Sequence, residues 1–239
     1  MLSRLPLHAA GTDEPGGCVI DRVVSSYTIS LTALLYSETR TRTAPPPILV
    51  LDGSGIPGAP ELKGVRQEIE DLQARFPDQV SSLDGPHATV SAARELIRNS
   101  SWIHLACHAL PGVSGQPPYL FLHDGRLRIE RLGWSASSAA EFAYLSACST
   151  AEAALDATDE AHHLTAALQA AGFPHVIGTL WGAVDDTGAV VAKQYYDRIN
   201  RAGTVTSPLF AEALHHTLRS IRESGLSPFC WVPYVHYGL

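Results

Sequence analysis

The segments WIHLACH (102–108) and EFAYLSACST (141–150) decide the fold of this 239-residue chain. Each is short, rich in β-prone residues and largely hydrophobic, which predicts two buried strands. His108 closes the first segment, and Cys148 lies at the end of the apolar run in the second. Because parallel strands gather their active residues at their carboxyl ends, the two segments predict a thiol and an imidazole that meet at one edge of a sheet.

Strands and helices alternate along the rest of the chain. ILVLD (48–52) is predicted to be a fully buried strand, and the helix after it has its apolar residues at steps of three and four. That apolar face consists of Leu62, Val65, Ile69, Leu72 and Phe76. A weak strand at 79–85 and a helix capped by Thr89 are predicted next, followed by a hairpin within 117–132 that turns at Asp124-Gly125. The second half is predicted to contain a helix at 161–172, a strand at 175–181, and helices at roughly 186–200 and 208–223. A last strand is predicted at 230–238, where Pro233 indicates an edge or a bulge. The fold class is therefore α/β, a three-layer α/β/α sandwich with a mainly parallel sheet.

Composition places the chain among intracellular globular proteins. A hydrophobic content of 45% is ample for one core, so residues 1–239 are predicted to form a single domain, with residues 1–45 as its N-terminal packing segment and a helix from about Thr28. The formal net charge of −7, without a basic block, argues against a nucleic-acid partner. Four cysteines without CxxC spacing, and no long apolar stretch, predict reduced thiols, a cytoplasmic location and no membrane segment.

A cysteine and a histidine can form a catalytic pair if the fold brings them together. A thiol needs a partner base within hydrogen-bonding reach to become a good nucleophile at neutral pH. Neighbouring strands lie about 4.8 Å apart, so His108 and Cys148 would be close if their strands are adjacent and parallel. The alternative is that both are core residues, since cysteine is among the most buried residue types and a histidine beside an apolar strand often only fills a core position.

Two cofactor hypotheses are weaker. His104 and His108 lie four residues apart, with Cys107 between them and His123 nearby, which would allow a zinc site. A strand sends Cys107 to the opposite face, however, and the cysteine pairs of structural zinc sites are missing. DGSG (52–55) follows a strand but lacks the GK[ST] ending of a phosphate loop and the spacing of a dinucleotide loop. No metal or organic cofactor is predicted.

Several ordered stretches resemble the CHAT domain, a caspase-like module often attached to TPR repeats and related to separase and to the caspase and gingipain peptidases. These stretches are HLACHA (104–109), LHDGRLRIERL (122–132), FAYLSACST (142–150), EAHHLTAALQAAGFPHVIGTLWGAVDD (160–186) and CWVPYVHYG (230–238). LPLHAAG (5–11) and DRVVSSYTISLTALL (21–35) are similar to the N-terminal part of fungal CHAT domains. The resemblance covers nearly the whole chain and implies a caspase-like sheet.

The resemblance also implies roles for individual residues. His108 matches the second histidine of the family's H-x-A-x-H-G segment and Cys148 the cysteine of its L-S-A-C segment, which are the base and the nucleophile in caspase-like peptidases. Backbone N–H groups of Ala109 and Cys148 would hold the oxyanion. Asp185 matches an aspartate that lines the pocket for a basic residue before the cut in separase-like peptidases; the alternative is that Asp185 only caps the next helix.

The resemblance leads to two functional hypotheses. The first is a cysteine endopeptidase that cleaves a protein partner. The second is an inactive CHAT domain that acts as a binding scaffold, which Ala109 favours because the family usually has glycine there and a position with φ > 0 would strain alanine. Related domains occur with TPR repeats, and this sequence has no such repeat, so a TPR regulator would belong to a longer chain or act in trans.

Overall fold

The structure is a computed structural model. It describes residues 5–12, 14–28, 34, 41–42, 45–56, 59, 61–110, 118–129, 140–146, 160–182 and 185–238, without the side chains of 41–42, 63, 110, 160–163 and 185–186. The predicted helix from about Thr28 lies almost entirely outside these residues.

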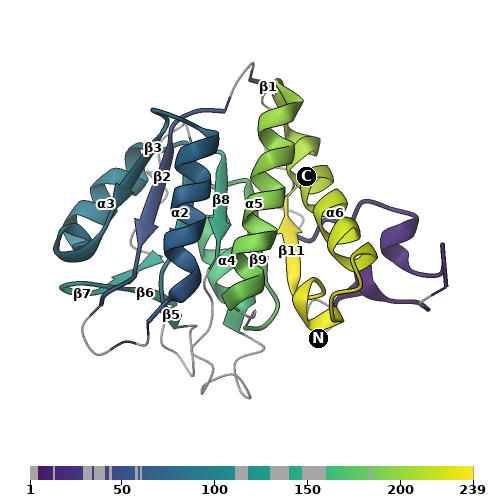
Figure 1. Ribbon diagram of the computed structural model, residues 1–239. Coiled ribbons are helices and arrows are strands. Elements are labelled where there is room, and N and C mark those ends of the chain that lie inside the picture. Colours follow the sequence, from purple (N-terminus) through teal and green to yellow (C-terminus); the bar gives the residue numbers. More distant parts are fainter. Residues whose placement is uncertain are drawn as a thin grey trace.

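A six-stranded sheet forms the centre of the molecule (Figure 1). Its strands, in spatial order, are β11 (Tyr234–Tyr237), β9 (His175–Thr179), β8 (Phe142–Leu145), β4 (Trp102–Ala106), β2 (Ile48–Asp52) and β3 (Val80–Leu83). Five of these strands are parallel, and β11 alone in this sheet runs antiparallel, at the edge beside β9. The predicted α/β class and mainly parallel sheet are confirmed.

Helices cover both faces of this sheet because alternate residues of each strand point to opposite sides. Ile48 and Val50 pack on one side with α2 (Lys63–Arg75), α5 (Asp185–Ala202) and α6 (Ser207–Glu223). Leu49 and Leu51 pack on the other side with α3 (Val90–Asn99) and α4 (Glu160–Ala170). In Figure 1, α2, α5 and α6 lie in front of the sheet. The molecule is thus the predicted three-layer sandwich.

Local sequence signals set the ends of several helices. The side chain of Thr89 accepts a hydrogen bond from the N–H of Ala92, which confirms the predicted cap of α3. Gly172 adopts φ 107° just beyond α4 and ends that helix as predicted. Pro208 lies in the first turn of α6, where its missing N–H costs nothing.

A small three-stranded sheet follows β4. It contains β5 (Ala109–Leu110) and the hairpin of β6 (Tyr119–Leu122) and β7 (Gly125–Arg128), so the hairpin predicted to turn at Asp124-Gly125 is confirmed. The N–H of Phe121 donates to the carbonyl of His108 over 2.9 Å. The hairpin therefore fixes the backbone that follows β4.

The N-terminal segment packs beside β11, on the opposite edge of the sheet from β3. Its two short 3-10 helices are η2 (Leu7–Ala9) and η3 (Val19–Asp21). The N–H of Tyr27 donates to the carbonyl of His236 in β11, and Arg222 of α6 pairs with Asp21 at 2.9 Å. The short strand β1 (Thr41–Arg42) pairs with β10 (Val205–Thr206), before α6.

The prediction for the last strand is wrong at its start. Residues Pro228–Cys230 form a 3-10 helix, η7, and β11 begins only at Tyr234. Pro233 has no N–H to donate, so the antiparallel ladder begins after it, although its carbonyl accepts the N–H of Leu180. The predicted edge position of this strand is confirmed.

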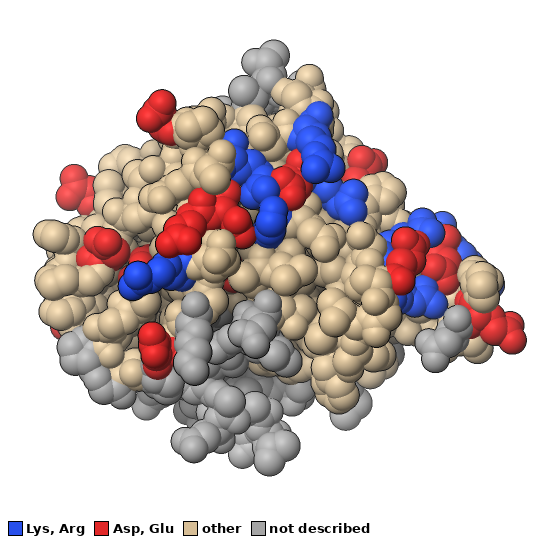
Figure 2. Space-filling view, in the orientation of Figure 1, with Lys and Arg blue, Asp and Glu red and all other residues tan. Residues whose placement is uncertain are grey.

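Basic and acidic side chains alternate over α2 and α5 on the face shown in Figure 2. Arg75 of α2 pairs with Asp197 of α5, and Lys193 lies 3.8 Å from the same carboxylate. The Arg75–Asp197 pair links the two helices, whereas the Lys193–Asp197 pair lies within α5.

Candidate active site

The strands that lead to His108 and Cys148 are adjacent and parallel. Leu105 of β4 is in register with Leu145 of β8, and the N–H of Ser146 extends the ladder by donating to the carbonyl of Leu105 over 3.1 Å. His108 is the third residue after Leu105, and Cys148 is the third residue after Leu145. The described part of this segment ends at Ser146, so Cys148 itself lies outside the described residues.

His108 lies in a closely packed part of the structure. It is 2% exposed, and its carbonyl is held by Phe121. The loop after β2 supports the preceding residues, because the N–H of Gly53 donates to the carbonyl of Ala106 over 2.9 Å. A Cβ at Gly53 would lie 2.4 Å from the Cβ of Cys107, so only glycine allows this close approach. The DGSG loop (52–55) therefore packs against the backbone of the residues that precede His108.

Ala109 has no backbone strain. Among the described residues, Asp78 is the one non-glycine residue with positive φ, so the alanine in place of the family's glycine does not adopt the left-handed conformation. In an antiparallel ladder the hydrogen-bonded and non-bonded pairs alternate. Since Phe121 bonds to His108, the pair Ala109 and Leu120 is the non-bonded one, and the N–H of Ala109 points away from β6.

A buried hydrogen-bond network that the sequence reasoning missed lies on the α2 side of the same strands. Oε2 of Glu68 lies 3.0 Å from Nε2 of His104 and also accepts the hydroxyl of Ser146. Nδ1 of His104 lies 3.2 Å from the hydroxyl of Tyr196, and its ring stacks on Tyr144 with centroids 5.0 Å apart. Glu68, His104 and Ser146 are all buried.

The tyrosines of this network stay protonated. Burial raises the pKa of Tyr144 and Tyr196 well above the usual value, and the nearby Glu68 carboxylate raises both further. Nε2 of His104 and the hydroxyl of Ser146 lie within hydrogen-bonding distance of the same Glu68 oxygen. A signal for this network was present in the sequence, since Glu68 lies three residues after Val65 and four before Leu72, on the apolar face of α2.

The backbone at Asp185 lies near this edge of the sheet. Strand β9, next to β8, ends at Thr179, and α5 begins at Asp185 after five intervening residues. The helix therefore starts on the carboxyl side of the parallel strands. The Asp185 side chain lies outside the described atoms, so its predicted role is untested.

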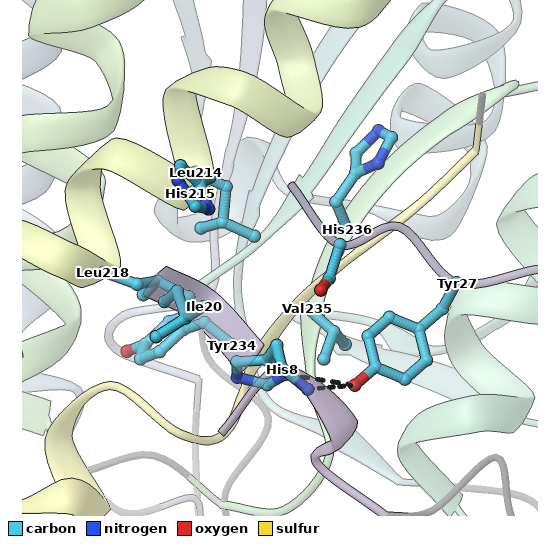
Figure 3. A pocket seen from close by; sticks show the side chains of 10 residues that line it. His8, Ile20, Tyr27, Leu214, His215, Leu218, Tyr234, Val235 and His236 are labelled. Carbon is cyan, nitrogen blue, oxygen red and sulfur yellow. Dashed lines mark hydrogen bonds between the residues drawn. The ribbon is translucent and has the colours of Figure 1, made fainter. Parts of the chain in front are cut away.

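A separate pocket lies outside β11, between the N-terminal segment and α6 (Figure 3). It is lined by Ile20, Leu214 and Val235 among others. Nδ1 of His8 lies 3.0 Å from the hydroxyl of Tyr27 there, as the dashed lines in Figure 3 show. Strands β9 and β11 separate this pocket from β8, so it is distinct from the candidate active site.

The described residues contain no group of three or more histidine, cysteine or acidic side chains arranged to hold a metal ion. Within the same part of the chain, no helix is both long enough and apolar enough to cross a membrane.

Comparison with known proteins gives one family and two structural neighbours. The CHAT domain family model matches residues 1–239. Two solved structures are similar: the Arg-specific cysteine proteinase gingipain R (RGPB), with 10% identity and a TM-score of 0.49, and a complex of the Porphyromonas gingivalis RgpB pro- and mature domains, with 11% identity and a TM-score of 0.47. Each comparison covers 80% of this chain and 45% or 47% of the other, so the chain spans less than half of these structures. A search of curated proteins gave no match.

Proposed function

Because the chain belongs to the CHAT domain family, we propose that it is a cysteine endopeptidase in which Cys148 is the nucleophile and His108 the general base and acid. The observation that supports this most is the register of β4 and β8: each candidate residue follows its strand at the same distance from a paired leucine. Two residues at equal distances along the chain from paired positions in adjacent parallel strands are expected at the same edge of the sheet. This favours side chains of His108 and Cys148 within the reach of a catalytic pair.

The proposed reaction has two steps. His108 takes the thiol proton of Cys148, the thiolate attacks the peptide carbonyl carbon, and the C–N bond breaks as His108 gives that proton to the leaving amine. Water, deprotonated by His108, then hydrolyses the thioester and releases the acid and the free thiol. The burial of His108 favours this chemistry by limiting access of bulk water to the reacting groups.

The oxyanion would be held by backbone N–H groups of Ala109 and Cys148. The N–H of Ala109 supports this role because it is not used in the ladder with β6. The absence of positive φ at Ala109 also weakens the main argument for an inactive domain, since the alanine Cβ causes no left-handed strain. A backbone donor needs no particular side chain at this position.

Asp185 is proposed to select a basic residue before the scissile bond. A carboxylate at the start of α5, near the carboxyl edge of the sheet, can accept two charge-assisted hydrogen bonds from a guanidinium group. Peptides that differ only at this residue test the proposal: faster cleavage after arginine supports it, and equal cleavage after neutral residues contradicts it.

The substrate is proposed to be a protein or peptide, inside the cell, with a TPR-containing regulator in the same longer chain or in trans. The rival function is a catalytically inactive CHAT domain that binds proteins as a scaffold. Ala109 in place of the family's usual glycine is the sequence feature that favours this rival.

Labelling with an electrophilic peptide probe separates the two functions. We expect mass spectrometry to find the probe on Cys148, and Cys148→Ala to abolish both labelling and peptide cleavage. Cys230→Ala is the matched control, because that thiol is partly exposed in η7 and does not follow β4 or β8. Absence of label on Cys148 under all activating conditions, or label on the buried Cys107, would favour the scaffold.

A further inference from the structure

We propose that Glu68 is a positioning residue for the candidate catalytic pair, because its carboxylate links the strand that leads to His108 with the segment that leads to Cys148. This inference rests on the proposed function and adds a residue that the CHAT resemblance did not supply. Its effect would be transmitted through His104 and Ser146.

The link joins both strands at one oxygen atom. Oε2 of Glu68 accepts the hydroxyl of Ser146 and lies 3.0 Å from Nε2 of His104. His104 is four residues before His108, and Ser146 is two residues before Cys148. A single carboxylate from α2 therefore links the middle of β4 to the residue that directly follows β8.

Ser146 is held in two independent ways. Its N–H donates to the carbonyl of Leu105 in β4, and its hydroxyl donates to Glu68. Two residues of chain span at most about 7 Å, so a fixed Ser146 limits where the Cα of Cys148 can lie.

The surroundings are shaped to keep this carboxylate in place. Glu68 is 4% exposed, and burial of a carboxylate is unfavourable unless its hydrogen bonds are satisfied. Gly188 of α5 faces it, and a Cβ at that position would already lie 3.4 Å from Oε1 of Glu68. Tyr196 of α5 holds the far nitrogen of His104. Residues of α2 and α5 thus enclose the carboxylate together with its hydrogen-bonding partners.

The experiment measures catalysis and thiol reactivity in Ser146→Ala. Loss of the hydroxyl removes the link while leaving the backbone bond to Leu105. Since a displacement of about 1 Å can cost about 100-fold in rate, we expect kcat to fall 10- to 100-fold with KM within twofold. We also expect slower alkylation of Cys148 by an electrophilic peptide probe. Ser146→Thr, which keeps a hydroxyl, should recover most of the loss, and Glu68→Gln should lie between wild type and Ser146→Ala.

Ser26→Ala is the matched control. The Ser26 hydroxyl is hydrogen-bonded to Nδ1 of the buried His236 and to the carbonyl of Gly238, each at 2.8 Å, but it lies beside β11. Its loss should lower the thermal midpoint without changing kcat. A purely structural role for Ser146 would give the same result as Ser26, with kcat per folded molecule unchanged.

The outcomes separate this inference from the function on which it rests. If wild-type Cys148 reacts rapidly with the probe and Ser146→Ala reacts and turns over equally fast, the positioning role is overturned and the peptidase proposal stands. If wild-type Cys148 is not labelled, both fail. Should Ser146→Ala not fold, Glu68→Gln decides by the same comparison, and a kcat within twofold of wild type would then overturn the inference.

Discussion

Lowering the pH from 8 to 5 should destabilise the fold through three buried histidines. His8, His175 and His236 are at most 3% exposed. Burial lowers the pKa of His8 and of His175 from 6.5 to about 4. Burial, with a further contribution from His175, holds the pKa of His236 well below its usual value. All three side chains are therefore neutral in the folded protein at pH 5, although an unfolded chain would protonate them.

The direction and size of the effect follow from the difference between the two states. The unfolded state takes up protons as the pH falls below 6.5, whereas the folded state resists until about pH 4, so stability is lost between these values. At pH 5 a shift of this size costs about 2 kcal/mol for one histidine. His8 and His175 together would remove about 4 kcal/mol, a large part of the stability of a typical domain, which is about 5–15 kcal/mol.

Urea denaturation followed by circular dichroism at pH 8, 7, 6 and 5 measures this loss. We expect the unfolding free energy to fall steadily from pH 6.5 downwards. His8→Gln should remove about 2 kcal/mol of the fall at pH 5, because glutamine cannot take up a proton but can still reach the hydroxyl of Tyr27. His87→Gln controls for the loss of an imidazole at an exposed position. A stability that stays constant from pH 8 to 5, or an unchanged slope in His8→Gln, would refute the reasoning.

Three further predictions concern single positions. Gly53→Ala should lower the unfolding free energy by about 1–3 kcal/mol in urea denaturation, because the alanine Cβ would overlap Cys107. A urea midpoint equal to that of the wild type would contradict the close contact between residues 53 and 107. Thr89→Ala should cost about 1 kcal/mol by removing the cap of α3, whereas Thr89→Ser should cost much less; equal losses would argue against the cap. Asp185→Asn should reduce kcat/KM at least tenfold for peptides with arginine before the cut and leave neutral peptides unaffected, and an equal reduction for both would indicate a structural role.

The alternation of apolar strands and amphipathic helices was enough to predict the layers of this fold. ILVLD (48–52) and WIHLACH (102–108) are continuous apolar runs, and such runs are typical of strands covered on both faces. The turn at Asp124-Gly125 and the cap at Thr89 were also predictable, because each depends on neighbouring residues only. The last strand was predicted to begin four residues too early, since its sequence is β-prone but Pro233 cannot donate to the ladder and Pro228–Cys230 form a 3-10 helix.

The buried network beneath the candidate site was not predictable in the same way. Glu68 and Ser146 are 78 residues apart in the chain, and their contact depends on how α2 packs over β8. A carboxylate on the apolar face of a helix indicates a buried partner, but it does not identify that partner. Strands β4 and β8 are adjacent and parallel, whereas the meeting of His108 with Cys148 stays a prediction from their register.

The central claim is that the thiol of Cys148 and the imidazole of His108 form one catalytic pair at the carboxyl edge of β4 and β8. A crystal structure of the protein covalently trapped with an electrophilic peptide tests it most directly. We expect the inhibitor carbon bonded to Sγ of Cys148, with a ring nitrogen of His108 within about 4 Å of that sulfur. A separation above about 8 Å, or a bond to a different cysteine, would contradict the claim.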